Sequence, residues 1–193
     1  MTNIIKPNIG IYSILYFFII KSKNIQLIAA PEGNKNAVGE HTLGLLLSLM
    51  NKLRNGHQSI RQGDWLREEH RGWELEGKTI GIIGYGNTGK KFAEKLKGFN
   101  VTIIYNDILR GIGDKNATEV SIKTLQEKSD VLSLHIPQNE STNQMINTSF
   151  IKAMKKASRV MIVARTEKGK QTIDHYSLMG FSKAYDAAIK NCS

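Results

Sequence analysis

Short apolar runs alternate with longer mixed segments through residues 79–164. The run at residues 79–83 is rich in β-branched residues, which is typical of a strand buried on both faces of a parallel sheet. Apolar side chains at helical spacing follow the first run at residues 88–97, and a further helix is expected at residues 148–156. Strands that alternate with helices predict an α/β fold. The predicted strands are residues 79–83, 101–105, 131–134 and 160–164.

A long helix is expected at residues 36–54, ahead of the first strand. Asn36 is the predicted N-cap, and Glu40 is expected in the first turn, where a negative charge favours the helix dipole. Residues 43–50 carry apolar side chains on nearly every face. A helix that is apolar all round is either buried or lies at an interface, so we expect a subunit contact here. Residues 55–77 are predominantly polar and are expected to connect this helix to the first strand.

A glycine-rich segment, residues 84–89, joins the first strand to the next helix. Its sequence is Gly84-Tyr85-Gly86-Asn87-Thr88-Gly89. The first glycine permits a tight turn, the second lets the backbone approach a pyrophosphate, and the third allows the helix to pack closely on the strand. The free N–H groups of residues 87–89 would point at the phosphates from the start of the helix. The segment therefore predicts a dinucleotide site on an incomplete Rossmann-type parallel sheet that follows a long linking helix.

Asp107 ends the second predicted strand, 18 residues after Gly89. A carboxylate at this point can accept hydrogen bonds from ribose hydroxyls. It would also repel a 2′-phosphate, so the predicted cofactor is NAD and not NADP. Arg110 follows three residues later and keeps NADP open as an alternative.

Charge and length narrow the possible partners. The chain has 193 residues, which is enough for one hydrophobic core. Its formal net charge is +10, a balance that can favour a polyanion. The lysines are scattered and are not interleaved with aromatic residues as on single-strand-binding surfaces, so no nucleic-acid partner is expected. A non-catalytic binding module that uses the basic surface remains an alternative.

One apolar run, a single cysteine and scattered histidines bear on the membrane, the compartment and metal binding. The apolar run at residues 9–20 is shorter than the roughly 20 residues of a membrane helix, so no membrane partner is expected. It predicts a buried element or a non-native leader, with a signal-peptide core as the alternative. The single cysteine, Cys192, favours a reducing compartment, and we expect a cytoplasmic protein. His57, His70 and His175 lack the spacing of a metal cluster, so no metal is expected.

Three separated segments resemble the D-isomer-specific 2-hydroxyacid dehydrogenases. Residues 36–47 resemble the linking helix of that family, residues 73–84 resemble the approach to its cofactor loop, and residues 129–137 resemble its strand–His–x–Pro element. The segments occur in the family's order, and the resemblance covers about residues 24–157. Within the family, the phosphoglycerate dehydrogenase branch is the most similar.

The resemblance implies a Rossmann domain inserted in a split substrate domain. It implies hydride transfer between NAD and a 2-hydroxy acid, in a homodimer that packs through the helix at residues 36–54. Residues 135–139, which include His135, Ile136 and Pro137, would line the cofactor. His135 belongs to this wall and is not the catalytic histidine of the family.

The resemblance weakens where catalytic groups are needed. In the family an arginine that binds the substrate carboxylate lies in an Asn-x-x-Arg-Gly context, whereas Arg165 here has Ile162 and Thr166 at the flanking positions. The family's catalytic carboxylate and histidine have no counterpart, so we expect a truncated and catalytically impaired protein of marginal stability. The expected division is a substrate-domain remnant or leader at residues 1–33, a partial NAD-binding domain at residues 34–165 and a divergent tail at residues 166–193.

The tail has a second resemblance. Residues 175–184 resemble the Tyr-x6-Lys segment of enoyl-acyl-carrier-protein reductases, with Tyr176 and Lys183 at its two positions. In those enzymes the tyrosine polarises the substrate carbonyl and the lysine binds the nicotinamide ribose. A chimeric NAD-dependent enoyl reductase is therefore an alternative function, and an amphipathic terminal helix is the alternative structure.

Overall fold

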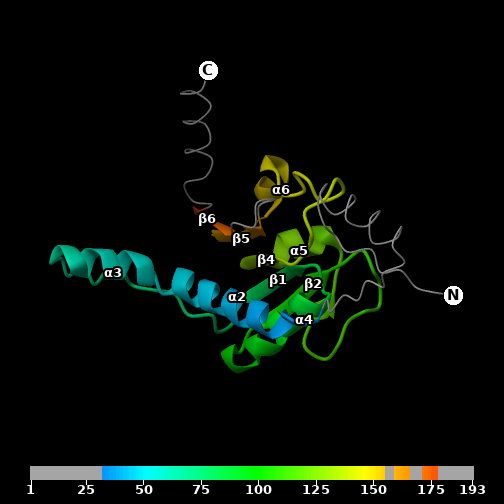
Figure 1. The fold of residues 1–193 in the computed structure, drawn as a ribbon, viewed down its shortest axis with the longest axis horizontal. Coiled ribbons are helices and arrows are strands. Elements are labelled where there is room, and N and C mark those ends of the chain that lie inside the picture. Colours follow the sequence, from blue (N-terminus) through cyan, green and yellow to red (C-terminus); the bar gives the residue numbers. More distant parts are fainter. Residues whose placement is uncertain (1–31, 155–158, 166–170, 178–193) are drawn as a thin grey trace, which may run out of the picture.

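A computed structural model describes residues 32–154, 159–165 and 171–177. The elements in chain order are α2 (Lys35–Met50), α3 (Leu53–Gln62), β1 (Thr79–Ile83), α4 (Asn87–Lys95), the 3-10 helix η1 (Leu96–Phe99), β2 (Thr102–Asn106), β3 (Thr118–Glu119), α5 (Ile122–Lys128), β4 (Val131–Leu134), α6 (Thr148–Ala153), β5 (Arg159–Arg165) and β6 (Gln171–Ser177) (Figure 1). The predicted run at residues 9–20 and the segment at residues 178–193 lie outside the described residues.

A four-stranded parallel sheet forms the centre of the fold. Its order is β3-β2-β1-β4, and the register pairs Ile82 of β1 with Tyr105 on one side and Ser133 on the other. The α/β class and the parallel sheet are therefore confirmed. Strands β1 and β4 have the predicted bounds, and β2 begins one residue later than predicted.

The prediction that residues 160–164 extend this sheet is wrong. These residues lie in β5, which pairs antiparallel with β6 in a separate two-stranded sheet, although β5 also contacts β4. The connection between the two strands covers only residues 166–170. So short a connection can return the chain as an antiparallel neighbour, whereas a parallel neighbour needs a crossover of a dozen or more residues.

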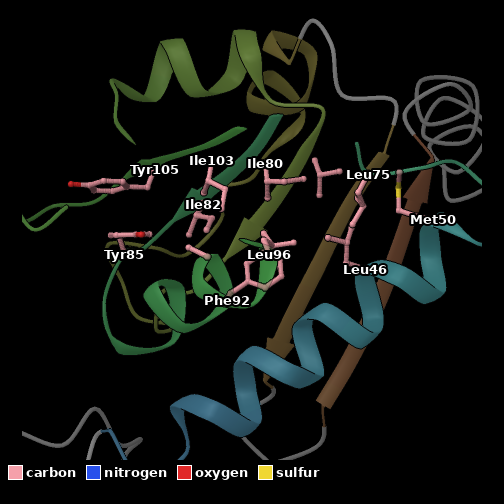
Figure 2. Packing of buried hydrophobic residues seen from close by; sticks show 12 residues of the cluster. Leu46, Met50, Leu75, Ile80, Ile82, Tyr85, Phe92, Leu96, Ile103 and Tyr105 are labelled. Carbon is pink, nitrogen blue, oxygen red and sulfur yellow. The ribbon is translucent and has the colours of Figure 1, made fainter. Parts of the chain in front are cut away.

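Helices cover both faces of the parallel sheet because its strands alternate apolar side chains between the two faces. On one face, Leu46 of α2 and Phe92 of α4 pack with Ile82 of β1 (Figure 2). On the other face, Leu125 of α5 packs with Ile104 of β2. The predicted apolar face of the helix at residues 88–97 is confirmed, since Phe92, Ala93 and Leu96 are all fully buried.

The helix predicted at residues 36–54 is wrong in its extent and its cap. Helix α2 begins at Lys35, after Asn34, so Asn36 lies inside it. Glu40 lies beyond the first turn and instead pairs with Lys95 of α4 at 2.9 Å. The helix ends at Met50 because Lys52 adopts a left-handed conformation, with φ at 51°.

Residues 51–72 form an excursion that we call the arm. It leaves the domain after Met50, runs along α3 and returns where the N–H of Trp73 donates to the carbonyl of Met50 at 2.9 Å. Helix α3 was not expected from the sequence, because none of its residues is buried and it has no core-facing apolar stripe. In Figure 1 it extends away from the sheet. Of the described helices, none is long and apolar enough to cross a bilayer.

Candidate functional site

The glycine segment forms a tight turn between β1 and α4. Gly84 has φ at +91°, and a Cβ there would lie 2.5 Å from the carbonyl oxygen of His135. Its N–H donates to the carbonyl of Asn106 at 2.9 Å, so the turn is tied to the end of β2. A Cβ at Gly89 would collide with the carbonyl oxygen of Gly84. Only glycine fits these two positions without movement of the backbone.

Gly86 differs from the other two glycines because it faces open space. A Cβ at Gly86 would have no atom within 4 Å, and Gly86 and Asn87 are both exposed. Gly86 is also the residue from which α4 begins, with Asn87, Thr88 and Gly89 as the first helical residues. The first N–H groups of a helix have no partner within it, and they carry the positive end of the helix dipole. The exposed backbone here can therefore receive a phosphate group.

Asp107 lies beside this turn at the end of β2. One of its carboxylate oxygens accepts from the N–H of Tyr85 at 2.6 Å, and the other accepts from the N–H of Leu109 at 2.9 Å. Each oxygen keeps a second lone pair for a ligand hydroxyl. Sequence reasoning did not single out Ile108, which follows Asp107 and is 96% exposed. An apolar side chain this exposed next to a polar site is the signal that could have found it.

The sequence predicts that residues 84–89, Tyr85 included, bind the cofactor, but the side chain of Tyr85 does not face the open side of the turn. Its ring is fully buried and stacks on the ring of Tyr105, with centroids 4.1 Å apart and planes 17° apart (Figure 2). Its hydroxyl donates to Asp114 at 2.9 Å. Burial is the largest cause that raises the pKa of both phenols. The Tyr85 side chain therefore belongs to the core, although its N–H still orients Asp107.

His135, Ile136 and Pro137 continue from the end of β4 past the glycine turn. The N–H of His135 donates to the carbonyl of Ile83 at 2.7 Å, which extends the pairing of β4 with β1. The Nε2 atom of His135 lies 3.0 Å from the hydroxyl of Ser133. Burial lowers the pKa of His135 to about 4, so its ring is neutral near pH 7. Ile136 is half-buried and Pro137 is exposed.

Of the catalytic candidates from the sequence, the structure describes Arg165 and Tyr176 and does not bring these two together. Arg165 is the last residue of β5 and pairs with Gln171, whereas Tyr176 pairs with Val160 near the opposite end of the same hairpin. Tyr176 lies in a strand, and Lys183 lies outside the described residues. Within the described ranges, no group of three or more His, Cys, Asp or Glu side chains is placed to hold a metal ion.

The topology and the turn together define a class of protein. The sheet order β3-β2-β1-β4, a glycine turn between β1 and α4 and a carboxylate at the end of β2 are the features of a Rossmann dinucleotide-binding domain. The turn lies at the carboxyl end of β1, where the strand order reverses and where ligands bind in open α/β sheets.

The comparison with protein families identifies the family of Rossmann proteins to which this chain belongs. Residues 43–178 match the family described as D-isomer specific 2-hydroxyacid dehydrogenase, NAD binding domain. The chain belongs to this family and contains its NAD-binding domain.

Individual relatives agree with this assignment. A hydroxypyruvate reductase from Thermotoga maritima is 34% identical over 158 residues, which cover 82% of this chain and 50% of the relative. The D-3-phosphoglycerate dehydrogenase 2 of Saccharomyces cerevisiae is 32% identical over 145 residues, which cover 75% of this chain and 31% of the relative. The chain therefore spans half or less of the length of these relatives.

Solved structures show the same fold. The NAD-dependent formate dehydrogenase of Staphylococcus aureus, in complex with NAD, is 28% identical with a TM-score of 0.62, over 71% of this chain and 42% of that one. An acyclic imino acid reductase in complex with NADPH and D-Arg is 30% identical with a TM-score of 0.63, over 72% of this chain and 45% of that one. Proteins similar to this chain thus hold either form of the cofactor.

Proposed function

We propose that residues 84–89 hold the pyrophosphate of NAD and that Asp107 holds the ribose hydroxyls on the adenine side. The exposed backbone at Gly86, at the start of α4, is the observation that carries this proposal. Asp107 supports it because the N–H of Tyr85 fixes the carboxylate beside the same turn. Ile108 and Leu109, both largely exposed, would cover one face of the adenine ring.

The nicotinamide half would lie along residues 135–137. Gly84 packs against His135 and Ile136, so the end of β4 and the glycine turn form adjoining walls. A neutral His135 suits this place because a cationic ring would repel the positively charged nicotinamide of the oxidised cofactor. The exposed Pro137 continues the wall outward.

A glycine substitution tests this proposal. Gly86→Val puts a side chain into space that no protein atom occupies, so the fold should persist while a pyrophosphate is kept away. Calorimetric titration should show that NADH binds the wild type and binds the variant at least about tenfold more weakly, a loss of about 1.4 kcal/mol.

Gly98→Val is the matched control, because Gly98 is also exposed, has no atom within 4 Å of its Cβ position and lies at the other end of α4 in η1. The control should bind NADH like the wild type. Equal affinity of all three proteins would contradict the placement of the pyrophosphate, and no binding by the wild type would contradict the proposal as a whole.

For the whole protein we propose the family reaction, hydride transfer between NAD and a 2-hydroxy acid, with Arg165 as the carboxylate-binding candidate. Because Ile162 and Thr166 replace the family's Asn and Gly around Arg165, we propose that this chain alone binds the cofactor with little or no turnover. The proposed NAD-binding domain is residues 34–165, between segments 1–33 and 166–193. Cytoplasmic localisation remains part of the proposal, supported by the single cysteine.

We further propose a homodimer that packs through α2 and the arm. Helix α3 has no buried residue, and an isolated ten-residue helix is marginal in water, so packing against a partner would stabilise it. The arm exposes four large apolar side chains, those of Leu53, Ile60, Trp65 and Leu66. A second copy of this chain fits the surface because the family resemblance implies dimers at this helix.

A further inference from the structure

The carboxylate of Glu119 accepts hydrogen bonds from the loop that follows Asp107 and from Tyr105, which precedes it. Glu119, in the edge strand β3, accepts from the N–H of Gly111 at 2.9 Å and from the hydroxyl of Tyr105 at 3.1 Å. Its other oxygen accepts from Nη1 of Arg110 at 3.2 Å. The Gly111 N–H, followed by the Arg110 guanidinium, lowers the pKa of the Glu119 carboxyl, which is therefore ionised near pH 7.

The position of Glu119 is fixed by its pairing with β2. Its backbone pairs in register with Tyr105, whose ring is buried and stacked on Tyr85. Asp114 also ties this loop to the core. Its carboxylate accepts from the hydroxyl of Tyr85 at 2.9 Å and from the N–H of Asn116 at 2.8 Å. The side chain that holds Arg110 therefore rests on the core of the domain.

Arg110 is the residue whose position matters for the cofactor. It is the single cationic residue between Asp107 and Asp114 in the sequence, and it comes three residues after the carboxylate proposed for the ribose. A 2′-phosphate on that ribose would need a cation near Asp107, and arginine is the side chain best suited to it. In this structure the guanidinium is instead directed to Glu119 and its charge is balanced there.

We propose that Glu119 is a specificity-determining positioning residue, which disfavours NADPH by keeping Arg110 from serving a 2′-phosphate. This inference rests on the proposed function of Asp107 in the ribose site. Asp107 excludes the phosphate by charge, and Glu119 keeps the guanidinium of Arg110, the cation nearest to Asp107 in the sequence, from compensating. The preference for NADH is thus set by two carboxylates, of which the second never touches the cofactor.

The substitution Glu119→Gln tests the inference without dismantling the loop. The amide oxygen of glutamine can keep the bonds from Gly111 and Tyr105, which share one carboxylate oxygen, while the amide nitrogen faces Arg110 without attracting it. Calorimetric titration should show NADPH binding about fivefold more tightly than in the wild type, with NADH affinity within about twofold, as expected when one exposed ion pair is released.

Arg110 provides the second arm of the experiment. Arg110→Met alone should leave both affinities nearly unchanged, because the guanidinium does not serve the cofactor in the wild type. The double variant with Glu119→Gln should lose the gain for NADPH. Glu94→Gln breaks a comparable exposed pair with Lys91 on α4 and is the matched control, which should not change the ratio of the two affinities.

The outcomes separate the inference from the proposed function. If the wild type binds NADH but Glu119→Gln leaves the NADPH-to-NADH ratio unchanged, the role of Glu119 is wrong and the proposed site stands. A gain that persists in the double variant would also overturn it, because the gain would not come from Arg110. Failure of the wild type to bind NADH would overturn the proposed function itself.

Discussion

At the scale of single residues, the glycine turn separates what its backbone does from what its side chains do. The N–H of Tyr85 orients Asp107, whereas the ring of Tyr85 packs into the core and its hydroxyl holds Asp114. Sequence reasoning could propose the glycines and Asp107 as site residues because the roles proposed for them depend on residue type and spacing alone. It could not place Tyr85 inward, because that depends on the conformation of the turn and on the stacking of its ring on Tyr105. It could not find Glu119 either, because the place of Glu119 depends on the register of β3 against β2.

His135 should make the stability of the domain depend on pH. Burial lowers its pKa from 6.5 to about 4, so the unfolded chain binds a proton that the folded chain excludes. The contribution of His135 to the free energy of unfolding is therefore fully present above about pH 6.5 and falls as the pH drops toward 4. The total loss from this residue is up to about 3 kcal/mol.

Urea unfolding at pH 7 and at pH 4.5 measures this effect. His135→Gln keeps a polar side chain beside Ser133 without a proton to gain, so its free energy of unfolding should fall less than that of the wild type. The comparison is needed because Asp114 and Glu119, whose pKa values are lowered in the fold, also lose stability in acid. Parallel losses in the two proteins would show that His135 does not contribute.

At the scale of elements, the turn between β1 and α4 should tolerate larger side chains poorly. Gly89→Ala would bring a Cβ against the carbonyl oxygen of Gly84. Gly89 lies in α4, and the Gly84 backbone is held by its N–H bond to the carbonyl of Asn106, so neither group can move away easily. We expect a loss of about 2–4 kcal/mol in the free energy of unfolding, measured by urea denaturation. Gly98→Ala, with no atom near its Cβ position, should change stability little, and equal effects at the two positions would argue against the close contact at this turn.

The elements that could be predicted are those whose burial leaves a pattern in the sequence. Strands β1 and β4 are largely buried and mostly apolar, so their bounds are visible as short apolar runs. Helix α3 is mostly polar and none of its residues is buried, so it is not visible as an apolar run. The direction of β5 could not be predicted either, since an apolar run does not say which strand pairs with it, and here β6 supplies an antiparallel neighbour.

At the scale of the whole molecule, the arm should decide the oligomeric state. Ile60→Asp puts a charge on an exposed apolar side chain of α3, where no buried residue would be disturbed. Sedimentation should show a dimer for the wild type and a monomer for the variant at micromolar concentration. Ile108→Asp is the matched control, since Ile108 is even more exposed but follows β2, and it should remain dimeric. A monomeric wild type would contradict the proposed dimer.

The arm and the core also differ in the chromophores that they contain. Both tryptophans of the chain, Trp65 and Trp73, lie in or directly after the arm and are 78% and 44% exposed. The stacked pair of Tyr85 and Tyr105 lies inside the domain instead. Tryptophan emission therefore reports on the solvent around the arm, and near-ultraviolet circular dichroism of the tyrosines reports on the packing of the sheet. One protein thus offers two optical signals, and each follows a different part of the molecule.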